Sequence, residues 1–142
     1  MGLWSFVKGA GKSVLGKSDP KKEDLLAEIE ELGLQAEGLD IELDGDTVKV
    51  GGTAVSQEMK EKVILAVGNV KGIGAVEDNV AGSEPVFHTV EKGDTLWAVA
   101  KKTLGDGNRY MEIFDANKPM LSHPDKIYPG QMLRIPTSGT GA

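Results

Sequence analysis

The chain has 142 residues, of which 39% are hydrophobic and 27% charged, and 22 acidic against 16 basic residues give a net charge of −6. This composition is typical of a folded globular protein and excludes disordered and fibrous classes. The absence of cysteine excludes disulfides, thiolate zinc sites and thiol nucleophiles, and only two histidines are present. No apolar run approaches the roughly 20 residues that a membrane-spanning helix needs.

Acidic charge is concentrated in one part of the chain. Residues 21–82 hold six lysines against fourteen acidic residues, a net charge of −8, whereas residues 1–20 are basic. A surface of this sign repels nucleic acid, so we expect no nucleic-acid partner. Residues 1–15 lack the basic start, continuous apolar run and cleavage site of a secretory signal. We therefore expect a cytoplasmic location, and we expect a monomer.

An amphipathic segment is predicted at residues 1–20. Over residues 3–15, apolar side chains recur at the spacing of one helix face: Leu3, Phe6, Val7, Ala10 and Val14. Glycines at positions 9 and 11 weaken this helix by about 1 kcal/mol each relative to alanine. Because the helix is short and precedes an acidic region, we expect its apolar face to cover a sheet or a domain junction.

Residues 21–82 predict one unit with the order helix, strand, strand, helix, strand. Asp19-Pro20 suits an N-cap followed by proline at the first helical position, and Gly33 suits the end of that helix. Apolar and acidic residues alternate over residues 39–44, and the alternation resumes after Asp44-Gly45. This pattern predicts a β-hairpin.

The second half of this unit contains a glycine-rich loop. Ser56 is expected to cap the second helix, the loop spans Gly68–Gly74, and the last strand follows at residues 75–80. Glycine permits backbone angles that other residues avoid. The pattern Asp40-x-Glu42-x-Asp44 resembles the start of a calcium loop, but Gly51 stands where that loop needs Glu. The hairpin interpretation is therefore preferred.

A second unit follows a short linker at residues 83–86. Residues 87–136 predict strand, helix, helix, strand, and residues 137–142 are expected to be a disordered tail. Two motifs of this region resemble the LysM family: Gly93-Asp94-Thr95-Leu96, and the ending Tyr128-Pro129-Gly130-Gln131-Met132-Leu133-Arg134-Ile135-Pro136. The resemblance implies the strand–helix–helix–strand fold of that family.

Residues 21–82 resemble a BON domain in their element order and in Val70–Val80, which contains Gly72-Ile73 and Val76-x-x-Asn79-Val80. An apolar start, a BON domain and a LysM domain in this order resemble a family of small bacterial potassium-binding proteins over nearly the whole chain. The fold class is therefore predicted as α+β, with two small domains, αββαβ (BON-like) at residues 21–82 and βααβ (LysM) at residues 87–136.

The resemblance implies K+ as the ligand and a role as ion sensor or buffer. Proteins hold this large, weakly hydrated cation with several backbone carbonyls, which are available where the chain turns tightly or a helix ends. Glycine spacing alone favours an ordinary loop, so the resemblance carries this prediction. The ligands expected are the backbone carbonyls of six residues: Val7, Ala10, Lys12, Gly68, Val70 and Ile73. Lys12 is basic where the family is acidic, so only its carbonyl can serve.

Two alternative functions remain. LysM domains often bind N-acetylglucosamine polymers such as peptidoglycan, and the resemblance places that site at Asp94, Thr95, Leu96, Lys118, Pro119 and Met120. The lack of a secretory signal and of aromatic residues for sugar stacking disfavours this alternative, and Asp94 and Thr95 are expected to be helix caps. BON domains are associated with phospholipid surfaces, to which Leu3–Leu15 could attach, although glycines and the acidic region disfavour a membrane partner.

Catalysis is not expected. Ser122, His123 and Asp125 lie in one loop, but neither an oxyanion-binding device nor a nucleophile turn accompanies them. His88 is expected to be a surface or packing residue of a strand. We therefore predict a binding protein and not an enzyme.

Overall fold

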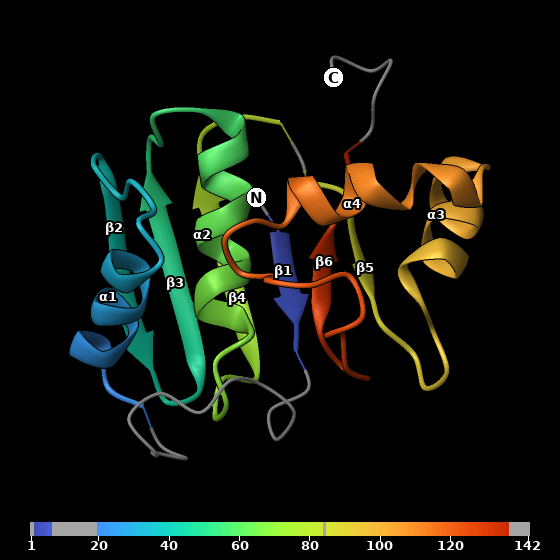
Figure 1. Cartoon of the computed structure of the whole chain (residues 1–142). Helices are drawn as coiled ribbons and strands as arrows, with labels where there is room; N and C mark the ends of the chain where they lie inside the picture. The colour runs from blue at the N-terminus through green and yellow to red at the C-terminus, as the bar shows by residue number, and fades with distance from the viewer. Residues whose placement is uncertain (1, 7–19, 84, 137–142) are drawn as a thin grey trace. The chain divides into compact units, whose positions relative to one another are not determined.

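The computed structural model describes residues 2–6, 20–83 and 85–136, and the chain divides into two compact units, residues 1–84 and 85–142 (Figure 1). Helices and strands occur in both units, which confirms the α+β class. Among the described residues, no helix is long and apolar enough to cross a membrane.

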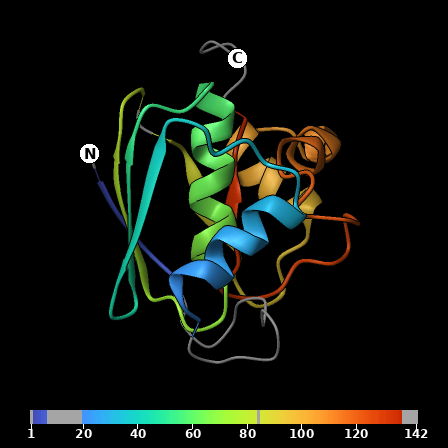
Figure 2. The same ribbon diagram turned by 90° about the vertical axis from the view of Figure 1, so that its left-hand side faces the viewer.

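The N-terminal unit is a four-stranded sheet with two helices against one face (Figure 2). Its elements are β1 (Gly2–Ser5), α1 (Lys22–Glu31), β2 (Leu39–Asp44), β3 (Thr47–Gly52), α2 (Gln57–Gly68) and β4 (Ala75–Val80). The strand order is β1-β4-β3-β2, in which β3 and β4 are parallel and the other pairs antiparallel. Buried Val48, Val50 and Val76 on the strands and Leu25 and Val63 on the helices contribute to the core.

Local signals place most of these elements where the sequence predicts them. Asp44 pairs with Thr47 across the β2–β3 hairpin, with Gly45 at φ 63° in its turn. The hydroxyl of Ser56 accepts a hydrogen bond from the Met59 N–H at 3.0 Å and caps α2. The hairpin and this cap are thereby confirmed.

Residues 2–5 are a strand, so the prediction of a helix from residue 3 is wrong there. Leu3 lies opposite Glu77 and Trp4 opposite Val76, because β1 pairs with the edge of β4. The helical spacing of apolar residues cannot reveal a strand edge that lies seventy or more positions away in the sequence. Residues 7–15 of the predicted helix lie outside the described residues.

The start of α1 also differs from the prediction. The helix begins at Lys22 with Lys21 as its N-cap, so Pro20 precedes the helix instead of occupying its first position. Asp24 Oδ2 accepts a hydrogen bond from the Lys21 N–H at 2.8 Å. This carboxylate, near the positive end of the helix dipole, sets the boundary. Asp19, the predicted cap, lies outside the described residues.

The C-terminal unit has a two-stranded antiparallel sheet and two α-helices. Its elements are β5 (Phe87–Thr89), α3 (Leu96–Leu104), the 3-10 helix η1 (Gly107–Arg109), α4 (Tyr110–Ala116) and β6 (Met132–Arg134). Eight buried apolar residues form its core: Val90, Leu96, Val99, Ala100, Ile113, Leu121, Leu133 and Ile135. The strand–helix–helix–strand order agrees with the sequence prediction.

Candidate functional site

The loop between α2 and β4 turns tightly. The Asn69 N–H donates to the Leu65 carbonyl at 2.9 Å, which ends α2. The Ile73 N–H donates to the Val70 carbonyl at 3.1 Å, and Gly72 between them has φ 103°. Val70 and Ile73 are both buried at 1% exposure. The loop is therefore a compact turn held by its own backbone, which is the predicted kind of segment.

A second set of contacts fixes the loop to the β2–β3 turn. The Gly74 N–H donates to the Asp46 carbonyl at 2.9 Å. A Cβ on Gly74 would lie 2.7 Å from Asp46 Oδ2, so this carboxylate lies directly against the loop. Glycine at position 74 allows that approach, and a negative charge beside the loop favours a cation over an anion.

The N-terminal segment reaches the same loop through Phe6. The Phe6 N–H donates to the Gly74 carbonyl at 2.9 Å. Its ring covers Gly68, because a Cβ at Gly68 would lie 2.1 Å from Phe6 Cζ. Phe6 is 8% exposed. Backbone and side chain of one residue thus attach the start of the chain to both ends of the loop.

Of the six predicted potassium ligands, Gly68 is the last residue of α2, Val70 and Ile73 lie in the loop that follows, and Val7, Ala10 and Lys12 lie outside the described residues. Asp46 was not identified from the sequence, and Phe6 was predicted on the apolar face of a helix. The available signal for Phe6 was Gly68, a glycine that directly follows the apolar residues 63–67 at the end of α2. In the described part of the chain, no three His, Asp or Glu side chains converge as a metal site.

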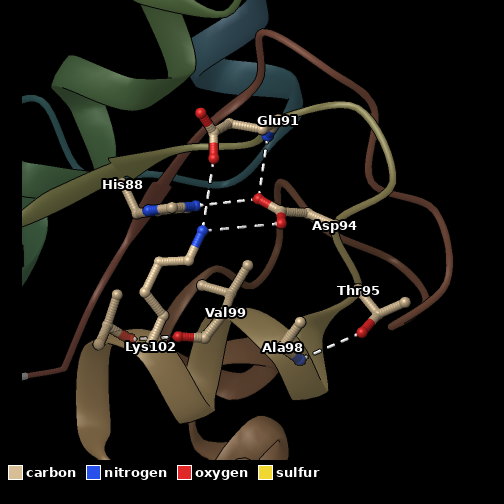
Figure 3. Close-up of polar contacts among 8 residues, drawn as sticks. His88, Glu91, Asp94, Thr95, Ala98, Val99 and Lys102 are labelled. Carbon is tan, nitrogen blue, oxygen red and sulfur yellow. Dashed lines mark hydrogen bonds and ion pairs between the residues drawn. The ribbon is translucent and has the colours of Figure 1, made fainter.

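Side chains in the predicted glycan site are used to hold the turn before α3 (Figure 3). Thr95 Oγ1 accepts from the Ala98 N–H at 3.1 Å and caps α3, as predicted. Asp94 is not a helix cap: its Oδ2 accepts from the Glu91 N–H at 2.9 Å and lies 3.2 Å from His88 Nε2. His88, expected as a surface or packing residue, therefore supports this turn.

The electrostatics of Asp94 follow from these contacts. The hydrogen bond from the Glu91 N–H has the largest effect and lowers the pKa of Asp94. Burial of the carboxylate raises this pKa, whereas the hydrogen bond with His88 and the positive charge of Lys102 lower it. Lys102 Nζ lies 3.9 Å from Asp94 Oδ1 and 3.4 Å from Glu91 Oε1. The ionised carboxylate is thereby stabilised as an acceptor for the turn.

The remaining predicted glycan residues lie on the same unit. Leu96 is buried in the core, to which Leu121 of the loop after α4 also contributes. Lys118 is exposed, with its Nζ 4.8 Å from the Phe114 ring centroid and 3.2 Å from Asp115 Oδ1. Pro119 is exposed and Met120 half-buried. The turn before α3 and the loop after α4 therefore flank one apolar core.

Comparison with known proteins identifies both the domain and the family. The LysM domain model matches residues 88–136. The chain is 45% identical to the Potassium binding protein Kbp of Escherichia coli O6:H1, over 96% of this chain and 99% of that protein. The chain belongs to the Kbp family. Its C-terminal unit is a LysM domain.

Two further relatives match in part. The Uncharacterized protein YqbP of Bacillus subtilis is 40% identical over 38% of this chain and 29% of its own length. The Endolysin of Bacillus phage B103 is 29% identical over 61% of this chain and 32% of its own length. The chain thus spans about a third or less of these two proteins, whereas it spans nearly all of the Kbp relative.

Proposed function

We propose that the protein binds a potassium ion through backbone carbonyls at the junction of its N-terminal segment and the loop after α2. The ligands are the carbonyls of Val7, Ala10, Lys12, Gly68, Val70 and Ile73. The protein acts as a cytoplasmic sensor or buffer of K+ and performs no catalysis. The relative of nearly equal length is named for potassium binding, which supports the choice of ion.

The contact of Phe6 with the loop is the observation that carries this proposal. Phe6, which directly precedes the predicted ligand Val7 in the sequence, donates its N–H to the Gly74 carbonyl. Its ring lies against the predicted ligand Gly68 at the end of α2, and its hydrogen-bond partner Gly74 follows the predicted ligand Ile73. The region that contains three of the predicted ligands thus contacts the residue that precedes the other three in the sequence.

The chemistry of the loop fits a monovalent cation. Neutral carbonyl oxygens replace the hydration shell of K+ at modest field strength, whereas convergent carboxylates suit Mg²⁺ and Ca²⁺. Asp46 against Gly74 and the net charge of −8 on residues 21–82 add a favourable field without a carboxylate cage. Glycines in the loop permit carbonyls to turn inward at low conformational cost.

Ion binding has a structural consequence in this proposal. Residues 21–82 are a BON domain, and K+ orders this domain against the N-terminal segment and the LysM domain. The ion binds the ordered state more tightly than the open state and so raises its population. This differential affinity is what the sensor role requires.

Calorimetry tests the proposal on the full chain freed of K+. Titration with KCl at constant ionic strength is expected to give saturable heat with a stoichiometry of one, and NaCl and MgCl₂ are expected to give none. Asp46→Asn should weaken K+ binding severalfold because it removes the carboxylate beside the loop, while Asp40→Asn at an exposed position of β2 should leave it unchanged. Equal heats with sodium, or no heat with potassium, would contradict the proposal.

The LysM domain supports a second candidate, binding of peptidoglycan or another N-acetylglucosamine polymer. The residues are Asp94, Thr95, Leu96, Lys118, Pro119 and Met120. Most of the polar atoms of Asp94 and Thr95 are occupied within the turn. Co-sedimentation with purified peptidoglycan tests this candidate, and binding that survives Lys118→Ala and Met120→Ala would exclude the proposed residues.

A further inference from the structure

Ser83, the last described residue of the N-terminal unit, is held at both of its backbone groups. Its N–H donates to Gln57 Oε1 at 2.9 Å. Its carbonyl accepts from Gln57 Nε2 at 2.9 Å and from Lys60 Nζ at 2.8 Å. Gln57 and Lys60 both belong to the first turns of α2. Three hydrogen bonds thus fix one residue of the chain to this helix.

The Lys60 side chain is buried and its ammonium contacts three acceptors, one of which is the Ser83 carbonyl. Its side chain is 2% exposed, and its Nζ also donates to the Val80 carbonyl at 3.2 Å and lies 3.6 Å from Asp78 Oδ2. The Asp78 side chain is 3% exposed. A buried ion pair contributes little net stability, and an apolar pair of the same size often serves as well. In this chain Asp78 lies against the same Lys60 ammonium that bonds the Ser83 carbonyl, so the pair helps to hold that ammonium in place.

Gly82 shows that the backbone is shaped for the same contact. Its φ is +130°, and a Cβ there would lie 2.5 Å from Gln57 Oε1 and 3.6 Å from Lys60 Cδ. Any other residue would be strained in its backbone and would displace the amide of Gln57. The approach of the chain to α2 at Gly82 and Ser83 thus requires glycine.

These contacts limit the connection between the two units. In the LysM unit the Ile135 N–H donates to the Val86 carbonyl at 3.0 Å, so Val86 is fixed there. Only Glu84 and Pro85 separate it from Ser83, and proline restricts its own φ. Without the contacts of Ser83, the last fixed residue of the N-terminal unit would be Ala81, whose N–H donates to Gly52.

We propose that Gln57 and Lys60 form a latch on Ser83 that fixes where the chain leaves the N-terminal unit and keeps both units on a short tether. A short tether raises the effective concentration of one unit at the other. Opening the latch frees Gly82 and Ser83 and adds about 7 Å of reach. Because α2 carries the latch at one end and Gly68 at the other, the latch also links the ion loop, residues 68–74 with three of the proposed ligands, to the tether. This last link rests on the proposed function.

The distribution of distances between the units tests the latch. The chain contains no cysteine, so Asp40→Cys and Lys126→Cys, both at exposed positions, provide two unique spin-label sites for pulsed EPR. Gln57→Ala removes two of the three bonds to Ser83 and is expected to broaden the distribution by several ångströms. Glu58→Ala is the matched control: it removes the Glu58–Lys62 ion pair of the same helix turn and should leave the distribution unchanged.

A second variant guards against unfolding. Lys60→Met combined with Asp78→Asn removes the buried charges, keeps an acceptor for the Val80 N–H, and should broaden the distribution as Gln57→Ala does. Distributions of both latch variants that coincide with the wild type, or equal broadening by Glu58→Ala, would overturn the latch.

Adding KCl distinguishes the latch from the proposed function. In the wild type K+ is expected to narrow the distribution, and in Gln57→Ala it should still bind by calorimetry without narrowing it. Narrowing by K+ that is equal in Gln57→Ala and the wild type would overturn the link between latch and ion loop. Absence of any K+ heat in the wild type would overturn the proposed function, while the K+-free distributions would still decide the latch.

Discussion

Replacing Gly68 by alanine is expected to destabilise the N-terminal unit, although glycine-to-alanine changes within helices ordinarily stabilise by about 1 kcal/mol. Gly68 is the last residue of α2. A Cβ there would lie 2.1 Å from Phe6 Cζ and 2.4 Å from both Cε atoms. Carbon atoms cannot approach this closely, so the Phe6 ring must shift away from α2 and lose part of its packing.

The magnitude follows from what Phe6 loses. Phe6 is 8% exposed, and full burial of a phenylalanine side chain contributes about 1.5–3 kcal/mol. Displacement of the ring also strains the hydrogen bond from the Phe6 N–H to Gly74, which contributes about 1 kcal/mol. Set against the helix gain, the net loss is about 1–3 kcal/mol. For a unit of this size, each kcal/mol lowers the melting temperature by about 4–8 °C.

Urea denaturation monitored by tryptophan fluorescence measures this loss. The chain has two tryptophans, so a Trp97→Phe background leaves Trp4 of β1 as the reporter of the N-terminal unit. Gly51→Ala is the matched control, because its Cβ would meet no atom closer than Asn79 Cβ at 3.9 Å. We expect Gly51→Ala to change the free energy of unfolding far less than Gly68→Ala.

A double-mutant cycle with Phe6→Ala isolates the contact. Once the ring is absent, Gly68→Ala should become neutral or stabilising. The reasoning is refuted if Gly68→Ala stabilises the wild-type chain, or if its effect is the same with and without the Phe6 ring.

Three further predictions concern the LysM domain. Asn117→Ala should lower its free energy of unfolding by about 3 kcal/mol, because the buried amide bonds both backbone groups of Arg134; a loss below about 1 kcal/mol in urea denaturation would argue against this role. The pKa of Asp94 is lowered mainly by the hydrogen bond from the Glu91 N–H. The ionised carboxylate therefore stabilises the folded domain above pH 3.8, its ordinary pKa, and this stabilisation is lost as the pH falls through the lower pKa of the folded state. Asp94→Asn should reduce the dependence of the free energy of unfolding on pH in this acidic range. Burial raises the pKa of Tyr128 to about 12, so its phenolate absorbance should rise near pH 12, and a midpoint near 10 would contradict the observed burial.

Much of the fold is encoded in local signals. Asp44-Gly45 between alternating strands is enough to predict a hairpin, and Ser56 and Thr95 are caps that need only the residues next to them. The start of α1 was mispredicted because Asp19-Pro20 and Asp24 both suit a helix start, and local sequence does not rank them.

Non-local contacts account for what the sequence did not predict. Strand β1 exists because β4 offers an edge to residues 2–5, whose own spacing equally suits a helix. The glycines of the segment 68–74 are visible in the sequence, but the contact of Phe6 with Gly68 joins residues that lie far apart in the sequence. Lys60 is one of four charged residues in the first half of α2, and nothing in its sequence neighbours indicates the carbonyls of Val80 and Ser83 to which it donates.

The central claim is that one potassium ion lies among backbone carbonyls where Phe6 attaches the N-terminal segment to the loop after α2. Anomalous diffraction at long wavelength, from crystals grown in KCl, locates potassium directly. The account predicts one strong peak surrounded by the carbonyl oxygens of Gly68, Val70 and Ile73 and of Val7, Ala10 and Lys12. A peak bound by carboxylates elsewhere, or a loop whose carbonyls face away from any peak, would contradict it.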